Sequence, residues 1–210
     1  MTAQDVAARV LASPARLGQV RLVCVDGPAG SGKTTFAGVL STELRVRVGT
    51  DSRDRRLLRA GAAGDDSVHA PVVVLHLDDL YEGWGGLEGS LWPRLDAQVL
   101  DPLRRGLPGR YQRYDWPSSR FAEWQPVPVP QVLVLEGCGS ARRAAGPVSP
   151  LRVWVQAPRD LRLARGLARD GMQAREHWLA WMRDEAVHFA AQDTRRRADV
   201  RLDAWGTMPT

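Results

Sequence analysis

The chain has 210 residues and a net charge of +5, and its 44% hydrophobic and 25% charged residues are the proportions of an ordinary globular protein. No apolar run approaches the roughly 20 residues of a membrane-spanning helix, and residues 1–17 lack the basic start and long apolar block of a secretion signal. Both cysteines fall in apolar segments. We therefore expect reduced thiols, a cytoplasmic protein, no membrane partner and a single domain over residues 1–210.

The first strong signal is a glycine-rich motif between a predicted strand and a predicted helix. A short helix is expected over residues 5–11, a buried strand over 20–25 and a helix over 33–44. Between the last two, residues 27–34 match G-x-x-x-x-G-K-[ST], the pattern of a phosphate-binding loop. The only lysine of the chain stands at its lysine position. The predicted nucleotide-binding residues are Gly27, Ala29, Gly30, Ser31, Gly32, Lys33, Thr34 and Thr35.

In such a loop, backbone N–H groups and the helix N-terminus point at phosphate oxygens. Lys33 would reach the terminal phosphates, and the Thr34 hydroxyl would hold Mg²⁺. A glycine-rich turn with a solvated lysine is the alternative, but the surrounding strand and helix favour phosphate binding.

The remainder of the chain alternates apolar strands with helices. Residues 45–70 are rich in glycine, arginine and acidic residues, and we expect a surface insertion there, with a short helix near 53–60 and no chemistry of its own. Further strands are expected over 72–77, 132–135, 151–156 and 200–202, and helices over 91–105, 158–170 and 173–191. This order predicts an α/β fold with a mostly parallel five-stranded sheet and helices on both faces.

Three further segments follow this framework and resemble elements of one enzyme family. Asp78-Asp79-Leu80-Tyr81 lies at the carboxyl end of the second strand, where ligands bind to parallel sheets. Tyr114-Asp115-Trp116 belongs to the aromatic segment 110–130. Arg162, Arg165 and Arg169 recur at helical spacing and therefore share a helix face.

With the phosphate loop, these segments resemble uridine kinases and related P-loop kinases of nucleosides and small metabolites, in the form typical of high-GC bacteria. The resemblance runs from Val20 to Asp203, apart from residues 45–70. It implies a three-layer P-loop kinase fold, a mobile arginine lid over 158–172, and ATP and Mg²⁺ as cofactors. It also implies a small-molecule hydroxyl acceptor, most of all a nucleoside such as uridine or cytidine, and it is compatible with a homo-oligomer.

The resemblance also assigns roles to residues. Asp78 would be the base toward the acceptor hydroxyl, Tyr81 would line the substrate pocket, and Glu136 would join Thr34 in holding Mg²⁺. Asp79 is an alternative for orienting a magnesium-bound water, and the aspartate pair is open to a capping role. Arg165 and Arg169 would stabilise charge on the transferred phosphate, and Arg162 would bind substrate. A solvated basic helix face is the competing interpretation of the arginines.

The acceptor side is less determined. Tyr114, Asp115 and Trp116 resemble the family's Tyr-Asp-Phe element and would bind the acceptor, although a packed hydrophobic hairpin is the competing interpretation. Ser119 stands where the family usually has a histidine that reads the pyrimidine, which leaves pantothenate or a sugar as alternative acceptors.

Two functions of other classes also fit the sequence. The basic composition allows a nucleic-acid-stimulated or regulatory ATPase, but no second lysine exists for a guanine-recognition element, and nucleic acid is not the expected partner. A nucleotide-binding module without transfer activity is the third reading.

Overall fold

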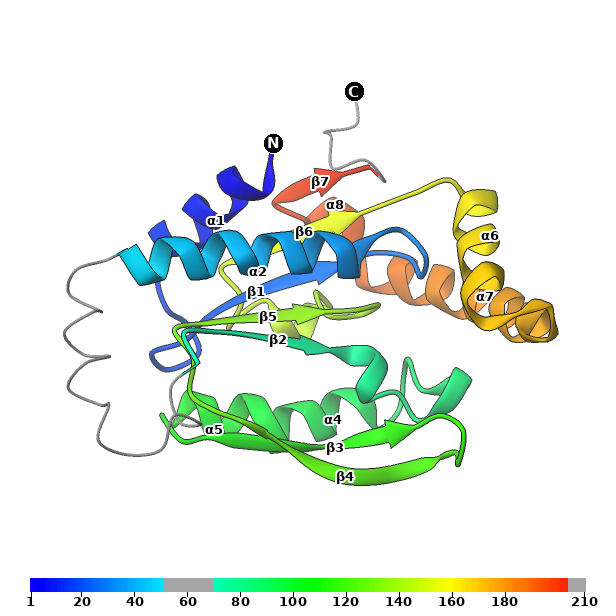
Figure 1. Ribbon diagram of the computed structural model, residues 1–210, viewed down its shortest axis with the longest axis horizontal. Helices are drawn as coiled ribbons and strands as arrows, with labels where there is room; N and C mark the ends of the chain where they lie inside the picture. Colours follow the sequence, from blue (N-terminus) through cyan, green and yellow to red (C-terminus); the bar gives the residue numbers. More distant parts are fainter. Residues whose placement is uncertain (51–69, 204–210) are drawn as a thin grey trace.

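A computed structural model describes residues 1–50 and 70–203 and has a five-stranded parallel sheet at its centre (Figure 1). The sheet order is β2-β5-β1-β6-β7, and each neighbouring pair is parallel. This confirms the predicted α/β fold. The strands are β1 (Arg21–Asp26), β2 (Val72–His76), β5 (Val132–Glu136), β6 (Leu151–Val155) and β7 (Val200–Leu202).

β1 is the central strand and β5 lies next to it, and the composition of both explains their place. β5 is Val-Leu-Val-Leu-Glu and is buried at each position, and β1 is buried at all positions but its first. A strand that is covered on both faces has a continuous run of apolar residues, whereas a strand with one solvent-exposed face alternates apolar and polar residues. Their register pairs Val23 with Val134 and Val25 with Glu136, so the ends of β1 and β5 lie together.

Helices cover both faces of this sheet, as predicted. On one face, α1 (Ala3–Ala12) and α2 (Lys33–Thr50) pack on Val23, Val25 and Val134. On the other, α4 (Leu91–Leu95), η3 (Asp96–Leu100) and α5 (Asp101–Arg104) join α7 (Arg175–Gln192) around a second core that contains Leu22, Leu133 and Leu135. The result is a three-layer arrangement in which the strand ends stay open at one edge of the sheet.

The predicted helix over 91–105 is present, but its middle is wider than an α-helix. η3 is a π-helical segment, and the N–H of Asp101 bonds to the carbonyl of Asp96. Pro102 follows directly in α5 and has no N–H to donate. The wider turn before this proline lets the helix continue through it.

The aromatic segment forms an antiparallel hairpin of β3 (Gly109–Asp115) and β4 (Arg120–Val127), apart from the main sheet. Its strands lie beside α4 and α5 (Figure 1). Close packing requires a glycine here, because a Cβ on Gly109 would lie 2.8 Å from the carbonyl oxygen of Gln98. β4 continues through Pro126 to Val127.

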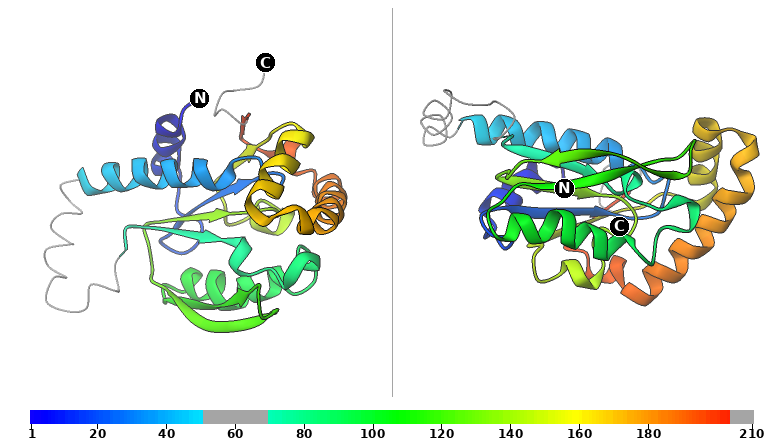
Figure 2. Two further views of the ribbon diagram at one scale, coloured as in Figure 1. Left: turned by 45° about the vertical axis from the view of Figure 1, so that its right-hand side comes forward. Right: turned by 90° about the horizontal axis from the view of Figure 1, so that it is seen from below.

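A helical arm formed by α6 (Arg159–Asp170) and α7 projects beyond the open edge of the sheet (Figure 2). The short helix α8 (Thr194–Arg197) leads from α7 to β7. The arm contains most of the predicted lid, residues 158–172.

The predicted surface insertion needs one correction. α2 continues to Thr50, so residues 45–50 are part of a helix, and Val48 in this stretch is buried. Residues 51–69, including the helix expected near 53–60, lie outside the described residues. Within the described ranges, no helix combines the length and the apolar composition needed to cross a membrane.

Candidate active site

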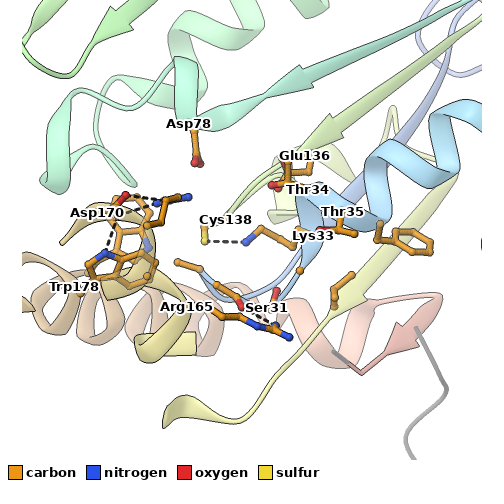
Figure 3. A pocket seen from close by; sticks show the side chains of 18 of the residues that line it. Ser31, Lys33, Thr34, Thr35, Asp78, Glu136, Cys138, Arg165, Asp170 and Trp178 are labelled. Carbon is orange, nitrogen blue, oxygen red and sulfur yellow. Dashed lines mark hydrogen bonds and ion pairs between the residues drawn. The ribbon is translucent and has the colours of Figure 1, made fainter. Parts of the chain in front are cut away.

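A pocket of about 1350 Å³ opens where the carboxyl ends of β1, β2 and β5 meet (Figure 3). The three strands deliver the phosphate loop, Asp78 and Glu136 to it. The arm of α6 and α7 supplies the opposite wall. The residues that line the pocket include Ser31, Lys33, Thr34, Thr35, Asp78, Tyr81, Trp84, Trp116, Glu136, Cys138, Arg165, Arg169, Trp178 and Trp181.

The phosphate loop follows β1 and curls into the N-terminus of α2, an 18-residue helix. Gly27 and Gly30 have φ angles of 140° and 76°. A Cβ on Gly27 would lie 2.0 Å from the carbonyl oxygen of Val155, and one on Gly30 would lie 2.7 Å from that of Arg162. These positions therefore require glycine. The Ser31 hydroxyl is buried and has no hydrogen-bond partner among the described residues. A cradle of this kind fits a phosphate group.

Lys33 lies in the loop with its ammonium group directed across the pocket floor. Its Nζ donates to the Pro28 carbonyl at 3.0 Å and lies 3.7 Å from the Cys138 Sγ. Burial alone would lower the Lys33 pKa, but Cys138 and the carboxyl groups of Glu136, Asp78 and Asp26 raise it above its usual value. Lys33 is therefore held charged at the point where a terminal phosphate would need a cation.

The Asp26 carboxylate supports the base of the phosphate loop, a role that the sequence did not predict. Its carboxylate accepts the backbone N–H groups of Gly27 at 2.7 Å, Gly139 at 2.9 Å and Ala141 at 2.8 Å. Burial raises the Asp26 pKa, and these hydrogen bonds and Lys33 oppose the rise. The residue thereby joins the segments that follow β1 and β5. In the sequence, the feature that could have indicated this role is an aspartate at the end of an apolar strand, because a buried carboxylate needs hydrogen-bond partners.

Asp78 lies in η1 (Leu77–Asp79), the turn that follows β2, and its carboxylate faces the pocket (Figure 3). Enclosure by the pocket walls raises its pKa and the Glu136 carboxylate raises it further, against the opposing effects of Lys33, Arg169 and His76. Across the pocket, the Glu136 Oε2 lies 2.7 Å from the His76 Nδ1. The hydrogen bond between them raises the His76 pKa.

The oxygen donors of Thr34, Glu136 and Asp78 line the same pocket, and hard oxygen ligands suit Mg²⁺. In the described part of the chain, no group of three or more His, Cys, Asp and Glu residues could hold a metal ion. A bound Mg²⁺ would thus rely on phosphate oxygens and water for most of its ligands, as is usual for this ion.

Aromatic side chains form the wall at the far end of the pocket. Trp84 lies in η2 (Gly83–Gly85) and stacks on His177, with ring centroids 5.4 Å apart and planes 12° apart. Trp116, Trp178 and Trp181 surround it edge-on at 5.6, 6.1 and 6.3 Å. The Trp116 Nε1 donates to the Asp78 carbonyl at 3.1 Å, which ties this wall to the proposed base. Trp84 and His177 were not among the predicted site residues.

The other acceptor-side residues divide between the pocket and the hairpin. Tyr81 lines the pocket, and its hydroxyl donates to the Cys138 carbonyl at 2.8 Å. Tyr114 does not line it, and packs edge-on against Trp116 and Phe121 at 5.5 and 5.3 Å. Asp115 accepts a hydrogen bond from Ser118 at the hairpin turn, also outside the lining. Of the Tyr114-Asp115-Trp116 element, only Trp116 lines the pocket, so the packed-hairpin interpretation describes the other two.

Two of the three predicted lid arginines line the pocket. Arg165 and Arg169 line the pocket: Arg165 Nη1 donates to the Gly30 carbonyl at 3.2 Å, and Arg169 Nε pairs with Asp170 at 2.7 Å. Asp170 also accepts the Trp178 Nε1 at 2.9 Å. Arg162 is outside the lining, because its Nη1 pairs with the buried Glu185 at 2.5 Å. The substrate role predicted for Arg162 stays a prediction, and in this structure its guanidinium is engaged by Glu185.

Comparison with known proteins gives no matching protein-family model and no matching curated protein. Solved structures do match over nearly the whole chain. A "possible uridine kinase" from Bacillus stearothermophilus has a TM-score of 0.59 at 18% identity, covering 96% of this chain and 97% of its own. A "putative fructose transport system kinase" from Silicibacter sp. TM1040 has a TM-score of 0.60 at 20% identity, covering 96% and 98%. The chain has the fold of P-loop kinases. At these identities the likeness concerns the fold alone.

Proposed function

We propose that this protein transfers the terminal phosphoryl group of ATP, with Mg²⁺, to a hydroxyl group of a small molecule, most of all a nucleoside. The proposal rests on a single pocket whose two ends differ in their chemistry. A phosphate-type cradle with a charged lysine forms one end, and an aromatic wall with a carboxylate forms the other. Transfer of a phosphoryl group between two small molecules requires that both are bound next to each other, so the two binding regions must belong to the same pocket.

At the donor end, the loop and the N-terminus of α2 bind the phosphates, and Lys33 adds a fixed positive charge. Thr34 and Glu136 are the residues that would hold Mg²⁺, which supplies charge neutralisation on the phosphate oxygens. Arg165 and Arg169 add guanidinium groups from α6. Beyond the loop, Ala3, Phe36 and Val39 extend the pocket with apolar surface that suits a nucleobase.

At the acceptor end, Asp78 accepts the proton of the attacking hydroxyl as the phosphoryl group arrives. A carboxylate with a raised pKa is a better proton acceptor than an ordinary one. Trp84 and Trp116 offer aromatic surface beside it, which favours an acceptor with a planar ring. A sugar also stacks on tryptophan, and together with pantothenate it is the runner-up acceptor.

An ADP-release assay over nucleosides, pantothenate and sugars tests the proposal. We expect ADP release that requires Mg²⁺ and one class of acceptor, and its loss in Lys33→Met. The Arg47→Met variant is the matched control, since it removes a positive charge from the exposed last turn of the same helix. Release that depends on DNA or RNA, or that proceeds equally without any acceptor, would overturn the proposal.

A further inference from the structure

A buried ion pair behind the phosphate loop is used by neither end of the pocket. Glu185 on α7 is 2% exposed, and its Oε1 lies 2.5 Å from Arg162 Nη1 on α6. Its second oxygen, Oε2, accepts the backbone N–H of Ala29 at 2.8 Å. Arg162 Nη1 also donates to the Ala29 carbonyl at 3.4 Å. One ion pair from two helices therefore holds both backbone groups of a single loop residue.

The pair supports the loop from outside the pocket. Neither Arg162 nor Glu185 lines the pocket, whereas the loop residues from Ala29 to Thr35 do. The α6 backbone also packs against the same turn, because a Cβ added to Gly30 would lie only 2.7 Å from the Arg162 carbonyl oxygen. Within the described chain, the Arg162 Nε is buried without a partner, so this guanidinium depends on Glu185 for its burial.

We propose that Glu185 is a positioning residue that sets the phosphate loop in its anion-binding shape before a nucleotide arrives. Gly27, Gly30 and Gly32 all adopt positive φ, and glycine backbone is free to leave such conformations. A loop that orders only on binding loses affinity, because the ordering cost is subtracted from the binding free energy. Charge-assisted hydrogen bonds from two helices hold Ala29 in place in advance.

The same face of α7 carries Trp178 and Trp181, seven and four residues before Glu185, and both line the acceptor end. Residues at this spacing lie on one side of a helix. Glu185 therefore connects the phosphate loop to the helix that forms the acceptor wall. The inference rests on the proposed function only for the identity of the anion, which is taken to be a nucleotide phosphate.

The test compares Glu185→Gln with Asp184→Asn, which makes the same change of charge at the exposed neighbouring position of α7. Two quantities are measured: hydrogen exchange of residues 27–34 without ligand, and the dissociation constant for ADP with Mg²⁺ by calorimetry. We expect faster loop exchange and an ADP dissociation constant raised about tenfold in Glu185→Gln, with the control like wild type. If Glu185→Gln fails to fold, Glu185→Asp is used instead. The shorter side chain keeps the negative charge but no longer reaches the Ala29 N–H, and we again expect faster loop exchange and weaker ADP binding.

A purely structural role of Glu185 predicts something else. It would lower the melting temperature and speed exchange in α6 and α7, while loop exchange and ADP affinity matched the control well below the transition. That result would overturn the proposal, as would weaker ADP binding without a change in loop exchange. If wild type did not bind ADP at all, the proposed function would fail, and loop exchange would still decide the role of Glu185.

Discussion

Replacing Gly166 by alanine tests how closely the helical arm is packed beside the pocket. Gly166 is the buried residue of α6 that faces Trp178 on α7. A Cβ at this position would lie 2.3 Å from the Trp178 Cε2, whereas carbon atoms in contact prefer about 3.5–4.0 Å. The indole must therefore move by about 1 Å or more, and overpacking of this kind costs about 1–3 kcal/mol.

The matched control is Gly38→Ala in α2, where a Cβ would meet nothing within 4 Å. Both variants gain helix propensity, about 1 kcal/mol relative to glycine, so their difference isolates the contact with Trp178. At about 2–4 °C per kcal/mol for a chain of this size, Gly166→Ala should melt about 2–12 °C below Gly38→Ala. Scanning calorimetry measures both. Equal stabilisation in the two variants would refute the packing of α6 on Trp178.

Four further predictions concern the chemistry of the pocket. Lys33→Met should leave the circular dichroism spectrum unchanged and weaken ADP binding, measured by calorimetry; unchanged affinity would contradict the phosphate assignment. Asp78→Asn should lower transfer about 10²–10⁴-fold with ADP affinity retained, whereas a loss confined to ADP binding would make Asp78 a metal ligand. Because burial and Glu136 raise the Asp78 pKa above 3.8, wild-type transfer should decline on acidification already above that pH, as the carboxylate takes up its proton; a profile flat down to pH 4 would exclude Asp78 as the base. Removal of Mg²⁺ by EDTA should abolish transfer, and ADP release assayed before and after readdition of Mg²⁺ would show whether it does.

Much of the architecture was predictable because local signals and tertiary structure agreed. The continuous apolar runs of β1 and β5 are what a sheet covered on both faces demands, and the motif at Gly27 to Thr34 requires a strand before it and a helix after it. Asp78 and Glu136 could be placed in the site because Asp78 follows β2 and Glu136 ends β5, and the carboxyl ends of parallel strands share one edge.

The details that the sequence could not place depend on contacts distant in sequence. Helical spacing predicted a shared role for Arg162, Arg165 and Arg169, but Arg162 pairs with Glu185, 23 residues later, and does not line the pocket. Aromatic density pointed to Tyr114, but the hairpin register places it behind Trp116. The partners of Asp26 and Trp84 come from segments distant in sequence, so the local pattern did not identify them.

The most direct test of phosphoryl transfer follows both products in one reaction. Wild-type protein is incubated with Mg²⁺ and ATP, with and without the acceptor found in the release assay, and ADP and phosphorylated acceptor are quantified by mass spectrometry. The account predicts one phosphorylated acceptor for each ADP, and almost no ADP without acceptor. ADP accompanied by free phosphate, at the same rate with or without acceptor, would contradict it.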